Sequence, residues 1–157
     1  MGGVTLNALM LGALALLLVS AGIQDARTRE IADWKNSAIA LLAPLWWWSN
    51  GLPLWPDLAI QIGVAALVFG LFWVAFHFGQ MGGGDVKMIG ALALWFPFES
   101  LLRMLIIMSL LGGALTLLLL IERALKRKIS TIEVPYGVAI AIAALISLPE
   151  PFLNQFL

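Results

Sequence analysis

The stretch Leu58–Phe78 reads LAIQIGVAALVFGLFWVAFHF and contains no Asp, Glu, Lys or Arg. An apolar run of about 20 residues is long enough to cross a bilayer as a helix. Similar runs occupy Val4–Ile23 and Leu101–Ile121, and a shorter one occupies Val134–Leu148. The chain is 62% hydrophobic and 11% charged, with a mean hydropathy of +0.99, whereas a soluble domain carries about 25% charged residues. The sequence therefore predicts an all-α membrane protein.

Two further apolar stretches, Ser37–Trp48 and Met88–Phe98, are short for a perpendicular crossing. If both cross, the loops at 24–36, 79–87 and 122–133 fall on one side of the membrane. Of the 9 basic residues, only Arg103 then lies on the other side. The remaining ones are Arg27, Arg29, Lys35, Lys87, Arg123, Lys126, Arg127 and Lys128. Because basic loops stay in the cytoplasm, we predict a bundle of about six helices, two of them short, with both termini outside.

Composition also limits the function classes. The chain has 0 cysteines and 1 histidine, His77, so disulfides, thiolate zinc sites and cysteine nucleophiles are excluded. We expect no metal and no cofactor. Net charge is zero, and no run that combines basic and aromatic residues indicates nucleic acid. No Lys or Arg precedes Val4–Ile23, so we expect a retained helix rather than a signal peptide, and a single membrane domain over residues 1–157. The tryptophans at 46–48 are expected at the outer interface.

Two aspartates suggest chemistry. Asp25 follows the first apolar run, and Asp85 follows the glycines at 82–84 and precedes the Met88–Phe98 stretch. In the six-helix arrangement both lie at the same depth on the cytoplasmic side. Ionisable groups at membrane depth are costly and usually functional, and two neighbouring carboxyls that share a proton can activate water for hydrolysis. Glycines there permit φ > 0 and a close approach of substrate backbone.

Each aspartate taken alone is equally consistent with a helix cap. Two other functions remain open on the residues themselves. The pair could serve a small transporter or channel subunit as a proton or cation relay. The chain could also be a non-catalytic assembly scaffold.

Three segments resemble one protein family. Gly82-Gly83-Gly84-Asp85 fits the Gly-x-Gly-Asp signature of membrane aspartyl proteases, and with Val86-Lys87 it resembles type IV prepilin peptidases. Asp25-Ala26-Arg27-Thr28-Arg29-Glu30-Ile31 resembles that family's other aspartate motif, and the segment from Val134 to Ala141 resembles its last-helix motif.

The resemblance implies an enzyme that cleaves the short basic leader from pilin-like precursors at the cytoplasmic face of the bacterial inner membrane. It implies Asp25 and Asp85 as the catalytic pair. By the same match, an active-site loop comprises Gly82, Gly83, Gly84 and Lys87, and substrate-binding positions are Pro135, Tyr136 and Gly137.

The chain departs from longer members of this family. Those members carry a cytoplasmic insertion after the first helix, often with zinc-binding cysteines, and also N-methylate the mature pilin. Here that loop is short and cysteine is absent, which argues against methyltransferase activity. The chain resembles the short branch associated with tight-adherence (Flp-type) pili. Ala32 stands where many members have proline.

Overall fold

The computed structural model describes residues 2–126 and 134–148. The described residues form six α-helices and one short helical turn, η1, and contain no strand. In chain order the elements are α1 (Gly2–Thr28), α2 (Asp33–Ser49), η1 (Leu54–Leu58), α3 (Ala59–His77), α4 (Gly83–Ala93), α5 (Phe98–Lys126) and α6 (Tyr136–Ser147). The all-helical class is confirmed.

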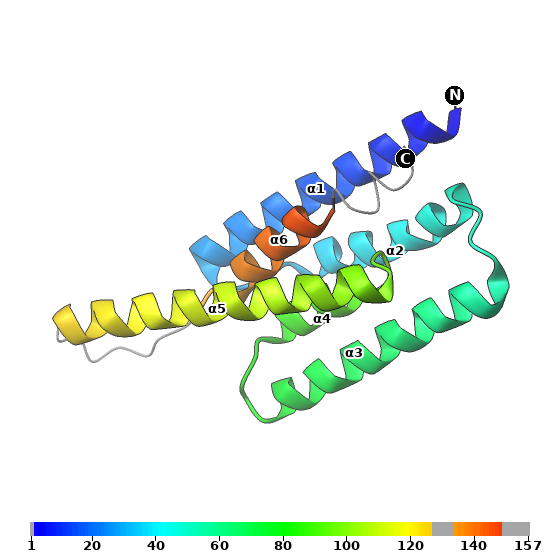
Figure 1. The fold of residues 1–157 in the computed structure, drawn as a ribbon. Helices are drawn as coiled ribbons and strands as arrows, with labels where there is room; N and C mark the ends of the chain where they lie inside the picture. The colour runs from blue at the N-terminus through cyan, green and yellow to red at the C-terminus, as the bar shows by residue number, and fades with distance from the viewer. Residues whose placement is uncertain (1, 127–133, 149–157) are drawn as a thin grey trace.

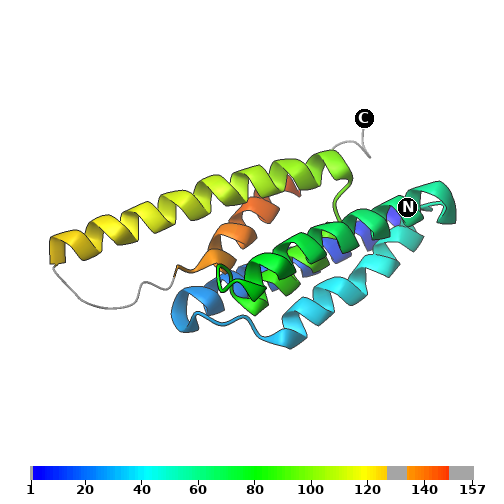
Figure 2. The same ribbon diagram turned by 90° about the horizontal axis from the view of Figure 1, so that it is seen from below.

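Three segments are long and apolar enough to cross a membrane: Leu6–Thr28, Leu54–His77 and Phe98–Lys126. Most residues of α3 and α5 are exposed, and most of these exposed residues are apolar. In water this surface would be costly, whereas lipid tails solvate it. The helices therefore identify a membrane protein. The C-terminal part of α5 projects beyond the other helices (Figures 1 and 2).

Helix α4 lies at the centre of the bundle, in contact with α2, α3 and α6 (Figure 2). Every residue from Met88 to Ala93 is buried. Its C-terminal carbonyls receive side-chain donors from neighbouring helices. Gln61 Nε2 donates to the Ala93 carbonyl at 2.8 Å, and Trp47 Nε1 donates to the Leu94 carbonyl at 2.8 Å. These bonds satisfy groups that a buried helix end would otherwise leave unpaired, and they fix the position of α4.

Helices α1 and α6 pack side by side, and α6 also packs on α5 (Figure 1). Small residues allow the first of these contacts. A Cβ atom placed on Gly22 would lie 3.2 Å from the Cβ of Ala141. On the other side of α6, the Tyr136 ring packs so closely on Gly112 that a Cβ there would lie 2.5 Å from it. Close packing of this kind is typical of helices in membranes.

The three tryptophans at 46–48 differ in their surroundings. Trp48 is exposed as expected, but Trp46 is buried and its ring lies 5.5 Å from that of Trp95. Trp47 is half-buried and donates to α4. Three successive residues on a helix point in different directions, so Trp46 packs toward the core while Trp48 faces outward.

Candidate active site

Asp25 lies in the last turns of α1, not after the helix as the sequence suggested. The helix continues to Thr28, whose Oγ1 donates to the Gln24 carbonyl at 3.0 Å. It ends where Arg29 adopts φ +59, a left-handed conformation that stops helical hydrogen bonding. Asp25 is 4% exposed. Its carboxyl group is therefore held on a helix instead of a loop.

The start of α6 holds the Asp25 carboxyl group. The backbone N–H of Val138 donates to Asp25 Oδ2 at 3.2 Å. Gly137 approaches so closely that a Cβ there would lie 2.8 Å from Asp25 Cγ and 2.7 Å from Ile31 Cδ1. Only a glycine at residue 137 leaves room for the carboxyl group. The last-helix motif of the sequence thus contacts the first aspartate.

Asp85 lies in the first turn of α4, which begins at Gly83 and not near Met88. Its side chain is 9% exposed. The glycines before it have negative φ, since the described glycines with positive φ are Gly51 and Gly79. These glycines instead allow neighbouring side chains to pack close to the backbone. A Cβ on Gly84 would lie 3.2 Å from Ile31 Cβ, and one on Gly82 would lie 3.0 Å from Asp85 Oδ2.

The structure brings the two aspartates to the same place. Two adjoining cavities of about 410 and 390 Å³ are both lined by Asp25, Arg29, Gly82 and Asp85. The charge of Asp25 acts on Asp85, and that of Arg29 acts on Asp25. Carboxyl groups so arranged do not both ionise readily. A ligand in these cavities would therefore lie beside both carboxyl groups.

The other candidate residues divide into two groups. Gly83 lines the first cavity and Tyr136 the second, and Gly137 contacts Asp25. Lys87 lines neither cavity. Its Nζ instead pairs with Asp33 Oδ1 at 2.7 Å on an exposed face. Pro135 is buried and lines neither cavity.

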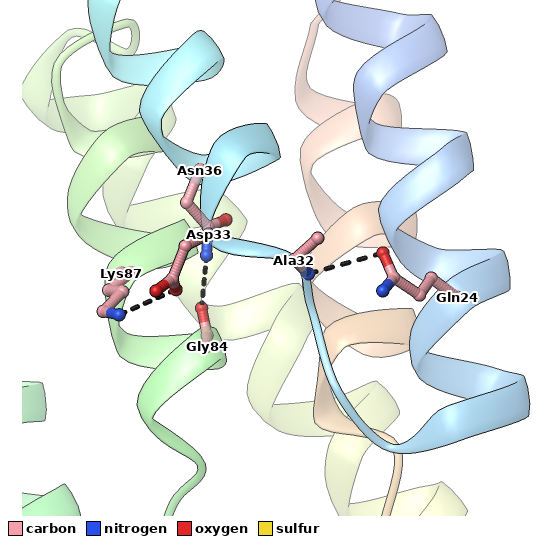
Figure 3. Close-up of polar contacts among 6 residues, drawn as sticks. All are labelled: Gln24, Ala32, Asp33, Asn36, Gly84 and Lys87. Carbon is pink, nitrogen blue, oxygen red and sulfur yellow. Dashed lines mark hydrogen bonds and ion pairs between the residues drawn. The ribbon is translucent and has the colours of Figure 1, made fainter.

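Three polar contacts fix the α1–α2 connection and the start of α2, two of them to α4 and one to α1 (Figure 3). Asn36 Nδ2 donates to the Gly84 carbonyl at 3.1 Å, next to Asp85. The Ala32 N–H donates to Gln24 Oε1 at 3.3 Å, and Lys87 pairs with Asp33. The sequence did not indicate Asn36, because it falls at the end of the predicted loop 24–36, where a polar residue is ordinary. Ala32 has φ −61 and ψ 131, a backbone that proline also adopts.

Replacing Asn36 with leucine should lower activity more than stability. The change keeps the side chain's approximate size but removes the donor to Gly84, so Asp85 is less firmly placed relative to Asp25. We expect turnover per folded molecule to fall by about tenfold or more, with a small change in KM. Asn7→Leu is the matched control, because Asn7 is also buried but bonds Asn50 at the far end of α2. Equal losses of turnover in both variants would contradict a local role for Asn36.

Among the described residues, no group of three or more His, Cys, Asp or Glu side chains is placed to hold a metal ion. The donors near the cavities are carboxylates on different helices, with Arg29 beside them.

Two buried carboxyl groups lie at one end of a helical bundle that contains three helices of membrane-spanning length. These features define the class of the chain, a membrane protein with a polar site among its helices. The profile of the type IV leader peptidase family matches residues 12–117, which is more than half of the chain and includes both aspartates. The chain therefore belongs to the type IV leader peptidase family, and membership implies peptidase activity on prepilin leaders in general. No curated protein and no solved structure gives a significant match.

Proposed function

We propose that this chain is an aspartic endopeptidase that removes the basic leader from Flp-type prepilins at the cytoplasmic membrane face, with Asp25 and Asp85 as its catalytic dyad. The observation that carries the proposal is the convergence of the two carboxyl groups. They come from α1 and α4, far apart in the sequence, yet they line the same two cavities. Family membership supplies the leader as substrate.

The chemistry needs one ionised and one protonated carboxyl group. The ionised aspartate takes a proton from a water molecule as the water oxygen attacks the carbonyl carbon of the scissile peptide bond. The protonated aspartate donates to the carbonyl oxygen, which gives a neutral tetrahedral intermediate. The intermediate collapses when the aspartate that took the water proton gives it to the nitrogen and the C–N bond breaks. The other aspartate takes back a proton from a hydroxyl of the intermediate, which restores one ionised and one protonated carboxyl group. The Val138 N–H, 3.2 Å from Asp25 Oδ2, orients that carboxyl group for proton transfer.

The relay alternative is less well supported. A proton or cation path would place acids near the middle of the membrane. Asp25 lies one turn from the end of α1, and Asp85 lies in the first turn of α4. Both therefore face one end of the bundle, where a polar leader could reach them. A scaffold without catalysis gives no reason to bury two carboxyl groups beside one cavity.

Co-expression with an Flp-type prepilin tests the proposal directly. The wild-type protein should convert the precursor to a shorter product, and mass spectrometry of the new N-terminus should locate the cut after the basic leader. A precursor that stays intact beside folded, membrane-inserted protein would contradict the proposed activity.

Cleavage should resist chelators. The proposed dyad uses no metal, and the described residues include no three-ligand cluster. Purified protein treated with EDTA and then dialysed should keep its initial rate of leader removal. A loss of activity that added Zn²⁺ or Mg²⁺ reverses would contradict the metal-free mechanism.

The side of the membrane on which each end of the bundle lies can be tested with single-cysteine variants, because the chain has 0 cysteines. Ser49→Cys and Asn50→Cys, at the end of α2 away from the aspartates, should react with a membrane-impermeant maleimide added to intact cells. Arg29→Cys and Lys126→Cys should react only after lysis. The opposite pattern would place the dyad outside the cell, away from unprocessed leaders.

A further inference from the structure

Arg29 is an unusual residue for its place at the end of α1. Among the described residues it is the one non-glycine residue with positive φ, at +59. Its N–H donates to the Asp25 carbonyl at 2.9 Å, a bond typical of a helix that ends in a left-handed residue. Glycine is the usual residue there, because a Cβ is disfavoured in that conformation. The backbone alone therefore gives no reason for an arginine.

Arg29 also lies at the candidate active site. It lines both cavities that contain Asp25 and Asp85, and no other Lys or Arg in the described part of the chain lines either cavity. A cation at this place would repel a basic leader, so the leader does not explain it. Its charge acts on Asp25, and an opposite charge nearby favours the ionised form of a carboxyl group.

The surroundings of Asp25 favour a negative charge in a second way. Its Oδ2 accepts from the Val138 N–H at 3.2 Å, and the Gly137 N–H acts on the same carboxyl group. Both N–H groups belong to the first turn of α6, where unpaired backbone donors favour an anion. Asp25 therefore has two backbone donors and one cation.

Asp85 has less support for a negative charge. It lies in the first turn of α4 and has the Gly82 N–H beside it. The side-chain charge that acts on it is that of Asp25, which opposes its ionisation. Lys87, two residues further along α4, pairs instead with Asp33. An ionised Asp25 beside a protonated Asp85 is the arrangement that these contacts favour.

Other titratable groups face the pair from neighbouring elements. Glu30 and Asp33 line the larger cavity. Both are acidic and oppose ionisation of the pair, so a local cation matters more. Tyr136 of α6 lines the smaller cavity. Lys35 of α2 lines neither cavity, and its Nζ donates to the Ser20 carbonyl at 2.9 Å.

We propose that Arg29 is a positioning residue that holds the negative charge of the pair on Asp25. Asp25 is then the base that takes the water proton and later gives it to the leaving nitrogen. Asp85 is the acid that donates to the carbonyl oxygen and takes a proton back from the intermediate. The inference rests on the proposed peptidase function and adds the division of roles between the two aspartates.

The pH dependence of kcat/KM tests the proposal, because a base that must be ionised gives the acidic limb of the profile. Arg29→Gln removes the cation, so the midpoint of that limb should move to higher pH by about 1 unit, and the alkaline midpoint should move less. Arg29→Lys keeps the charge and should restore the wild-type profile. Arg27→Gln is the matched control, since Arg27 is exposed and lines neither cavity. An unmoved acidic midpoint in Arg29→Gln, or the same shift in Arg27→Gln, would overturn the proposal.

Arg29→Gly separates the side chain from the turn. Glycine adopts positive φ freely and keeps the N–H that bonds to the Asp25 carbonyl, so the thermal midpoint should be at or above that of wild type. Cleavage per folded molecule below the acidic midpoint should still fall by about tenfold, as a shift of about 1 unit requires. Wild-type turnover in this variant would refute the role of Arg29 alone. Failure of wild-type protein to cleave any Flp-type prepilin would instead refute the proposed function.

Discussion

Asp85→Asn should reduce leader cleavage per folded molecule by about 10³-fold, within the range of about 10²–10⁴-fold that general acid–base groups supply. An amide has the shape of the carboxyl group but can neither take a proton from water nor give one to a carbonyl oxygen. Asp25→Asn should have the same effect, since an amide oxygen can still accept from the Val138 N–H. The measurement is the initial rate of leader removal in detergent, normalised to folded protein.

The double variant, Asp25→Asn with Asp85→Asn, makes this prediction sharper. Residues that act as one catalytic unit give non-additive losses, so the double variant should be no slower than either single one. Asp57→Asn is the control, because Asp57 is exposed and lines neither cavity. Near-normal cleavage by either single variant would show that the carboxyl pair is not the dyad.

The sequence could predict that Asp25 and Asp85 lie on the same side of the membrane, because each helix crossing moves the chain to the opposite side. Apolar lengths and the placement of basic loops put Asp25 and Asp85 on one side, which required no knowledge of which helices touch. The cavities that both residues line agree with that placement. Hydropathy could identify α1, α3 and α5 because a membrane-spanning helix needs a long apolar run. It could not give their ends, which depend on local contacts such as the Arg29 turn at φ +59.

Contacts between distant segments were outside the reach of the sequence. Nothing in the order of residues indicates that α6 packs on α1 and places Gly137 against Asp25, or that Asn36 reaches Gly84. The glycines at 82–84 illustrate a further limit. Glycine serves either backbone conformation or close approach, and only coordinates distinguish the two. Here Ile31 and Phe76 occupy the space that side chains on Gly84 and Gly83 would need.

Gly137→Ala should cost about 10²-fold in turnover, the effect expected when a catalytic group moves by about 1 Å. The added methyl would lie 2.8 Å from Asp25 Cγ and 2.7 Å from Ile31 Cδ1, closer than real Cβ contacts allow. Cδ1 is the flexible end of the Ile31 side chain and can move away. The Asp25 carboxyl group accepts a hydrogen bond from the Val138 N–H and is less free to move, so the start of α6 and Asp25 must separate. Overpacking of this kind costs about 1–3 kcal/mol, so the protein should still fold.

Gly113→Ala is the matched control, because a Cβ there meets nothing within 4 Å and Gly113 is also in a helix. It should keep wild-type turnover and a thermal midpoint at or slightly above that of wild type. Ile31→Val then separates two causes in the Gly137→Ala background. Removing the Ile31 δ-methyl relieves the contact at 2.7 Å but leaves the one with Asp25. If displacement of the carboxyl group is the cause, stability should recover while turnover stays low. Full recovery of turnover would instead show that the contact with Ile31 caused the loss, and that Gly137 does not position the Asp25 carboxyl group.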